Sequence, residues 1–353
     1  MKILIKNGTL VTANKKFDVL KADLLIENGI IKKISKNISN KDAKVVDATD
    51  QFVTPGFVQA HTHLCQVLFR GLADDLPLLT WLKKKIWPME YAHNKASLKA
   101  SSLLGLLEMQ KLGTTSILDM ATTKHTEQVF DAVKESKMRY VGGPCFMDDK
   151  PYSGPLYKNT KTTIQESEDL YKTYHKSTDL IDYALCPRFA ISCTDEMMRY
   201  SAEFQKDNNI IIHTHASENL DEIAIVKKKT GHRNISYFHK LNMLNSKTVI
   251  VHGIHLNKTE IGYLKKAKSP IVHCPSSNLK LASGIASTHE YLKENLTVSL
   301  GSDGAPCNNT MDPFMEMRLA ALIQKPIFGS TALPAKKAFA MATINGAKTI
   351  GKD

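Results

Sequence analysis

The fold of this chain is decided at residues 55–63, where the sequence is PGFVQAHTH. Pro55 and Gly56 interrupt the chain, and the apolar run that follows ends in two histidines. Upstream, residues 1 to about 54 form short β-branched runs with turns at Asn7-Gly8 and Asn28-Gly29, a pattern typical of β-strands. We therefore expect two domains: residues 1–54 as the N-terminal part of a small β-sandwich, and residues 55–353 as a larger domain.

In the larger domain, short apolar runs alternate with helix-length amphipathic segments, such as residues 97–112, 126–136, 194–207 and 258–267. The eight apolar runs are residues 56–61, 115–120, 140–146, 183–189, 210–216, 248–252, 270–274 and 296–303. Eight buried strands alternating with helices predict an α/β fold, a (β/α)8 barrel of the TIM type. An open doubly wound sheet is the alternative, but the sequence has no glycine loop of the dinucleotide-binding kind.

Composition is that of a folded protein, with 353 residues of which 42% are hydrophobic and 23% charged. We expect a cytoplasmic location, because no apolar run is long enough to cross a membrane and the N-terminus lacks a secretory leader. The six cysteines form no C-x-x-C pair, which favours reduced thiols. The net charge is +12, yet the lysines form no basic stripe interleaved with aromatics, so we do not expect nucleic acid as a partner.

Residues able to bind a metal stand at the ends of several predicted strands. His61 and His63 end the first strand, His215 the fifth, His252 the sixth and Asp303 the eighth. The C-terminal ends of barrel strands converge on one pocket, so these residues can meet. Chance alone gives about 0.5 H-x-H pairs in such a sequence. The prediction of a metal site therefore rests on the whole set of residues in this order, and not on one pair. Neutral imidazoles and a carboxylate suit zinc or ferrous iron. We interpret His213, one layer deeper than His215, as a packed or hydrogen-bonded core histidine.

As a set, these motifs resemble the amidohydrolase superfamily and, more narrowly, its branch of S-adenosylhomocysteine, methylthioadenosine and 5′-deoxyadenosine deaminases. The matching segments are PGFVQAHTH at 55–63, HASE at 215–218, VHG at 251–253, HCPSSNLKL at 273–281 and GSDGAPCNN at 301–309. The resemblance implies one divalent metal, zinc or alternatively Fe²⁺, held by His61, His63, His215 and Asp303. A single metal is expected because strand four, CPRF at 186–189, lacks the carboxylated lysine of two-metal branches.

The resemblance also implies catalytic roles. Metal binding can lower the pKa of water from about 15.7 towards 7, and Asp303 is placed to accept its proton. His252 would orient the attacking oxygen, and Glu218 would protonate the ring nitrogen and help expel ammonia. Such proton transfers typically contribute about 10²- to 10⁴-fold each. Glu218 could instead be a helix-start carboxylate, and His252 a core histidine.

Three further residues bear on the substrate. Glu90 matches a family position whose carboxylate binds ribose hydroxyls, with an exposed helix residue as the alternative. Trp81 lies in the long insertion after the first strand, so we expect it in the pocket wall. Arg188 stands where many methylthioadenosine-type members have histidine, and PRF at 187–189 resembles both guanine and 5′-deoxyadenosine deaminases. We therefore expect adenosine, 5′-deoxyadenosine or methylthioadenosine to be preferred over S-adenosylhomocysteine.

The sequence thus predicts a hydrolytic deaminase of adenine nucleosides. Guanine deaminase and a triazine-type chlorohydrolase or aminohydrolase share the fold and remain alternatives, while a non-catalytic scaffold would lose the metal ligands. The family usually continues past the last barrel helix, here about residues 334–350, into strands that complete the small domain. Because this chain ends at Asp353, we expect those strands to be missing. The sequence leaves open whether the protein forms a homo-oligomer.

Overall fold

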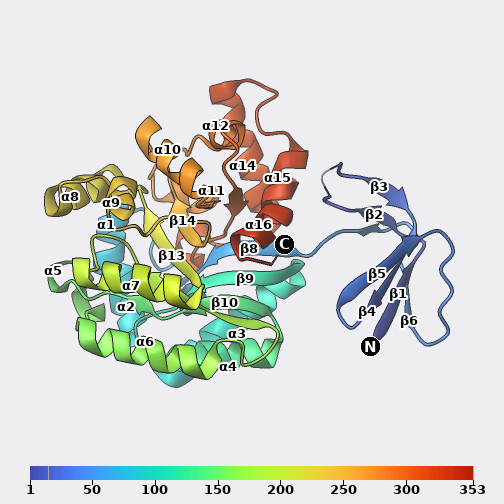
Figure 1. The fold of residues 1–353 in the computed structure, drawn as a ribbon, viewed down its shortest axis with the longest axis horizontal. Coiled ribbons are helices and arrows are strands. Elements are labelled where there is room, and N and C mark those ends of the chain that lie inside the picture. Colours follow the sequence, from blue (N-terminus) through green and yellow to red (C-terminus); the bar gives the residue numbers. More distant parts are fainter. Residues whose placement is uncertain (15, 353) are drawn as a thin grey trace. The chain divides into compact units, whose positions relative to one another are not determined.

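The computed structural model describes residues 1–14 and 16–352, and the chain divides into two compact units, Met1–Gly56 and Phe57–Asp353 (Figure 1). The first unit is built of two small sheets, ordered β5-β4-β1-β6 and β3-β2-β7. Its buried apolar side chains include Leu4, Leu10, Leu24 and Ile38. Its strands are β1 (Lys2–Lys6), β2 (Thr9–Val11), β3 (Val19–Lys21), β4 (Asp23–Glu27), β5 (Ile30–Ser35), β6 (Lys44–Asp47) and β7 (Phe52–Val53).

The second unit contains the parallel barrel that the sequence predicts, and this prediction is confirmed (Figure 1). Along the described chain its sheet runs β16-β15-β14-β13-β12-β10-β9-β8, with β11 paired to β12. The strands are β8 (Phe57–Thr62), β9 (Thr114–Met120), β10 (Arg139–Gly143), β11 (Cys145–Phe146), β12 (Ile181–Pro187), β13 (Ile211–Ala216), β14 (Thr248–His252), β15 (Ile271–His273) and β16 (Val298–Leu300). The predicted run 140–146 is split at Pro144, which has no N–H to give to a ladder.

Helices connect these strands and cover the barrel (Figure 1). Asparagine begins several of them: Asn94, Asn219 and Asn257 each accept a hydrogen bond from the first helical turn and form a capping box. The longer helices are α3 (Lys95–Lys111), α4 (Glu127–Ser136), α6 (Thr160–Tyr174), α7 (Asp195–Asn208), α8 (Leu220–Thr230), α9 (Asn234–Lys240), α10 (Lys258–Ala267), α14 (Pro313–Phe328) and α15 (Ala335–Ala342). The shorter ones are η1 (Leu64–Phe69), α1 (Leu78–Trp81), η2 (Leu82–Ile86), α2 (Trp87–Ala92), α5 (Lys150–Ser153), η3 (Gly154–Leu156), α11 (Pro275–Lys280), α12 (Thr288–Lys293), α13 (Ala305–Asn308) and α16 (Ile344–Thr349).

No helix within residues 1–14 and 16–352 is both long enough and apolar enough to cross a membrane.

The barrel closes between its last and first strands, where the backbones come very near each other. The predicted run 296–303 is a strand only over β16, and beyond it the N–H of Asp303 donates to the carbonyl oxygen of His61 at 3.1 Å. A Cβ atom at Gly301 would lie 2.8 Å from both Cβ and the carbonyl oxygen of His61. Only glycine therefore fits this position without moving the strand that carries His61.

We predict that Gly301→Ala destabilises the protein by about 1–3 kcal/mol, because the added methyl group overpacks against backbone that cannot yield. Gly262→Ala is the matched control. Gly262 lies within α10 with open space around it, so its replacement should stabilise the protein by about 0.5–1 kcal/mol. Urea unfolding of both variants measures the two changes, and an unchanged midpoint for Gly301→Ala would contradict the closure described above.

Candidate active site

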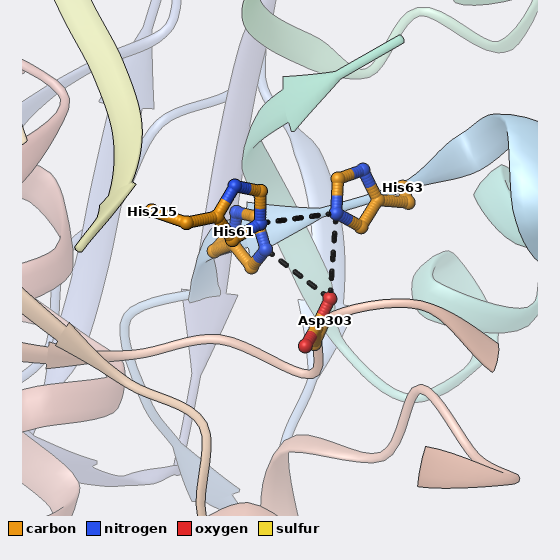
Figure 2. Close-up of side chains that lie close together, drawn as sticks. All are labelled: His61, His63, His215 and Asp303. Carbon is orange, nitrogen blue, oxygen red and sulfur yellow. Dashed lines mark hydrogen bonds and ion pairs between the residues drawn. The ribbon is translucent and has the colours of Figure 1, made fainter. Parts of the chain in front are cut away.

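Four predicted residues lie together at the C-terminal end of the barrel. Figure 2 shows the imidazoles of His61, His63 and His215 and the carboxylate of Asp303 pointing toward one another. One ligand atom from each lies within 4.8 Å of the others, and all four residues are buried. They come from the end of β8, from β13 and from the segment after β16. The barrel thus assembles residues that are distant in sequence.

The protonation of two rings follows from their hydrogen bonds. Nδ1 of His63 lies 2.8 Å from the carbonyl oxygen of Met120, and Nδ1 of His215 lies 2.8 Å from that of Arg188. A carbonyl only accepts, so each Nδ1 carries the proton and each Nε2 of the neutral ring is a bare lone pair. Burial lowers the pKa of His63 to about 3, which keeps that ring neutral.

These two bare nitrogens face each other, with Nε2 of His63 and Nε2 of His215 only 3.3 Å apart. Two lone pairs cannot form a hydrogen bond, so the contact is repulsive unless a cation lies between them. Tetrahedral ligands at about 2.0–2.2 Å from a metal are themselves roughly 3.4 Å apart. The donor set of three imidazoles and one carboxylate, each ring anchored by a second hydrogen bond, is therefore consistent with a divalent metal.

His61 and Asp303 complete the cluster. Nδ1 of His61 lies 2.8 Å from Nε2 of His213, and its Nε2 lies 3.2 Å from Oδ1 of Asp303. His213 is thus a hydrogen-bonded histidine behind the cluster. The Asp303 carboxylate also accepts hydrogen bonds from the Ser277 hydroxyl at 2.6 Å and from the Gly304 N–H at 2.7 Å. These contacts fix its orientation before any metal arrives.

Glu218 and His252 lie beside the cluster. Nε2 of His252 is 3.5 Å from Oε2 of Glu218 and 3.9 Å from Oδ2 of Asp303. Nδ1 of His252 lies 2.8 Å from Oδ1 of Asn278, which orients the ring. Burial raises the pKa of Glu218 well above its usual range, and the negative charge of Asp303 raises it further. Glu218 therefore keeps its proton to a higher pH than a solvated glutamate and can act as an acid.

A cavity adjoins the cluster. Its walls include Trp81 and Arg188 among the predicted substrate-binding residues, but not Glu90. The lining residues are His63, Gln66, Leu78, Trp81, Leu82, Arg188, Phe189, His215, Glu218, Glu222, His252, Leu281 and Asp303.

Glu90 lies behind the cavity wall, in a buried ion pair with Arg188. The two guanidinium nitrogens of Arg188 donate to Oε2 and Oε1 of Glu90 at 3.1 and 3.0 Å, and Nε2 of Gln66 donates to Oε1 at 2.9 Å. Burial alone would raise the pKa of Glu90, but the charge and hydrogen bonds of Arg188 outweigh it and lower this pKa. The sequence did not reveal Gln66, since its partner is 24 residues away.

A π-turn places Glu90 at this position. The helical segment from Leu78 to Ala92 is interrupted by η2, where the N–H of Trp87 bonds to the carbonyl oxygen of Leu82. Pro88 accounts for the interruption, because it has no N–H and its ring would clash with the carbonyl of Lys84 in a regular helix. In a regular α-helix, the eight residues from Leu82 to Glu90 would place the two side chains about 80° apart around the helix axis. The additional residue in the π-turn reduces this rotation to about 20°, so Glu90 lies on nearly the same side of the helix as Leu82.

Glu316 supports the other side of the cluster. This buried carboxylate of α14 accepts hydrogen bonds from the backbone and the hydroxyl of Ser276 and, at 2.9 Å, from Nδ2 of Asn308. Asn308 in turn donates to the carbonyl oxygen of Ser302, next to Asp303. Glu316 thereby ties together two segments that flank Asp303. Glu316 has no motif of its own, so the sequence did not indicate it.

Most of the chain matches a known protein family. The family model "Amidohydrolase family" matches residues 52–353. The chain therefore belongs to the amidohydrolase family.

Several relatives are similar over nearly the whole chain. A 5-methylthioadenosine/S-adenosylhomocysteine deaminase of Pyrococcus abyssi is 35% identical, over 99% of this chain and 81% of its own length. A 5′-deoxyadenosine deaminase of Methanothermobacter thermautotrophicus is 38% identical, over 95% of this chain and 78% of its own. Among solved structures, an adenosine deaminase of Xanthomonas campestris with bound zinc is 27% identical, covers 99% of this chain and 80% of its own, and has a TM-score of 0.88.

We predict that His63→Ala loses most of the divalent metal that the wild-type protein carries, because one of its four ligands is removed. Chelation of the wild-type metal should lower Tm, since it leaves the two bare nitrogens facing each other. His239→Gln is the control, because this exposed ring only stacks on Tyr263. Elemental analysis after dialysis measures the metal content. Equal metal content in His63→Ala and wild type would exclude this cluster as the site.

We predict that Glu316→Gln flattens the dependence of stability on pH. Burial raises the pKa of Glu316 to about 7, against about 4.5 in an unfolded chain. The folded state therefore binds more protons between these values, and its stability falls as pH rises through that window. The wild-type free energy of unfolding should fall by up to about 3 kcal/mol more than that of the variant between pH 4.5 and 7.5. Parallel profiles from urea unfolding would contradict this.

Proposed function

We propose that this protein is a hydrolytic deaminase of adenine nucleosides, which replaces the exocyclic amino group of the base by oxygen and releases ammonia. The observation that carries the proposal is the placement of Glu218. This proton-holding carboxyl lines the same cavity as the His63, His215 and Asp303 side chains. The deaminase names of the Pyrococcus and Methanothermobacter relatives support the same reaction.

We propose zinc as the metal, held by His61, His63, His215 and Asp303, with Fe²⁺ as the alternative. The zinc in the Xanthomonas relative supports the choice, as do the three neutral imidazoles. A divalent ion in this cluster would supply Lewis-acid chemistry that makes a water molecule nucleophilic at neutral pH.

Asp303, His252 and Glu218 have different roles in the reaction. Asp303, whose carboxylate adjoins both the cluster and His252, takes a proton from the attacking water. Because Nδ1 of His252 donates to Oδ1 of Asn278, its bare Nε2 accepts a hydrogen bond from the attacking water and orients the oxygen. Glu218 gives its proton to the ring nitrogen next to the attacked carbon. The proton that Asp303 collected then passes to the amino group, the carbon–nitrogen bond breaks and ammonia leaves, while the hydroxyl proton of the added oxygen returns to Glu218 and a carbonyl group forms.

Two residues of the cavity wall have side chains that can contact a purine base. Trp81 presents a large aromatic surface to a planar base, and Arg188 supplies a cationic edge. We propose that adenosine, 5′-deoxyadenosine and methylthioadenosine are preferred over S-adenosylhomocysteine. Guanine is the competing substrate, because Arg188 and Phe189 belong to the segment that resembles guanine deaminases.

We predict that Glu218→Gln lowers kcat for adenosine by about 10²- to 10⁴-fold, because the amide cannot give a proton to the ring nitrogen. Its metal content should match the wild-type value. Asp221→Asn is the control, since Asp221 is an exposed residue in the first turn of α8 and should keep nearly full activity. Ammonia release from metal-reconstituted protein measures both variants.

The same assay should be run with 5′-deoxyadenosine, methylthioadenosine, S-adenosylhomocysteine and guanine. Turnover of guanine alone would move the protein to the guanine deaminases. Full activity of Glu218→Gln on adenosine would refute the role given to this carboxyl.

A further inference from the structure

Glu222 is a helix-cap residue whose carboxylate reaches beyond its own helix. It is the third residue of α8, where it forms a capping box with Asn219. In a capping box the glutamate side chain accepts from the N–H of the cap residue. That contact is long here, at 3.4 Å, while the N–H of Glu218 donates to the same oxygen, Oε2, at 2.8 Å. The carboxylate therefore holds the residue before the cap, which is the acid of the proposed reaction.

A second capping box in the same chain provides a comparison. In α10, Oε2 of Glu260 accepts from the N–H of its cap residue Asn257 at 3.2 Å and from Nε of Arg233 at 2.9 Å. Neither partner is the residue before the cap. Capping a helix therefore does not by itself require the bond that Glu222 makes to Glu218.

The Glu222 side chain is held on both of its oxygens. It is 2% exposed, and its Oε1 accepts a hydrogen bond from Nδ2 of Asn234, a fully buried residue at the start of α9. A carboxylate fixed by a second helix has little freedom to move. It can therefore act as a firm anchor for the N–H of Glu218.

The chain bends sharply just before Glu218. Ser217 has a φ of +55°, in the left-handed region that favours glycine. Its carbonyl oxygen accepts the N–H groups of Ile254 and His255, at 2.9 and 3.0 Å. A non-glycine residue stays in this region only where its surroundings hold it firmly. The Ser217 carbonyl is the anchor on one side of the bend, and the bond from Glu218 to Glu222 is the anchor on the other.

We propose that Glu222 is a positioning residue, which fixes the backbone of Glu218 and so directs its proton-donating carboxyl toward the base. The inference rests on the proposed function and deepens it by adding a residue to the site. The contribution of Glu222 is geometric: Glu218 needs a hydrogen-bond acceptor at the place of Oε2, whether or not that acceptor is charged.

Two variants separate position from charge. Glu222→Asp keeps the carboxylate but draws it back by one methylene group, and we expect kcat for adenosine to fall about 10- to 100-fold. Glu222→Gln keeps the length and offers its amide oxygen to the same N–H, so kcat should stay within about threefold of wild type. Its Nε2 would meet Asn234, whose Oδ1 has no donor among the described residues and can turn to accept. The reverse pattern, with Glu222→Asp active and Glu222→Gln impaired, would overturn the inference.

Glu260→Asp is the matched control, because it shortens the corresponding residue in the capping box of α10. It should keep kcat within about threefold of wild type, and all variants should keep the wild-type metal content. Combining Glu222→Asp with Glu218→Gln should lower kcat no more than about threefold below Glu218→Gln alone, since Glu222 acts through Glu218. Losses that multiply in the double variant would contradict the positioning role.

Hydrogen exchange provides a test that needs no substrate. The amide of Glu218, followed by NMR or mass spectrometry, should exchange at least about tenfold faster in Glu222→Asp than in wild type, and at the wild-type rate in Glu222→Gln and Glu260→Asp. An unchanged rate in Glu222→Asp would overturn the inference. If the wild-type protein deaminates no nucleoside, the proposed function fails, and the exchange rates still decide whether Glu222 holds Glu218.

Discussion

The rest of the site depends on two bare imidazole nitrogens that face each other. Nε2 of His63 and Nε2 of His215 are 3.3 Å apart. The single N–H group of each ring donates a hydrogen bond to a backbone carbonyl. At that distance two lone pairs repel, and a cation between them turns the repulsion into coordination. The carbonyls of Met120 and Arg188 therefore do more than orient rings. By fixing the tautomers, they leave two lone pairs whose arrangement is consistent with binding a positive ion.

The barrel supplies these carbonyls from strands that neighbour the ligands. Met120 ends β9 beside β8, and Arg188 follows β12 beside β13, so strand pairing itself brings donor and acceptor together. Arg188 also carries the ion pair with Glu90 into the cavity wall. One residue thus connects His215 of the cluster with the cavity wall.

Much of this could be predicted from the sequence, for identifiable reasons. The barrel followed from apolar runs at regular spacing, and the cluster from polar residues at the ends of those runs. The pairing of Glu90 with Arg188 was not predicted, because the partners are 98 residues apart and no periodicity links them. Pro88, inside a helical pattern, was a usable sign of the π-turn. Glu316 gave none, since a buried glutamate looks like an exposed one in sequence.

The most direct test of the central claim is X-ray absorption spectroscopy of the zinc-loaded protein. Three nitrogen ligands and one protein oxygen ligand at about 2.0–2.2 Å are expected, with the imidazole scattering reduced in His63→Ala and in His215→Ala. Zinc ligated by sulfur, or imidazole scattering unchanged in both variants, would contradict the account, because the facing nitrogens would then serve no ion.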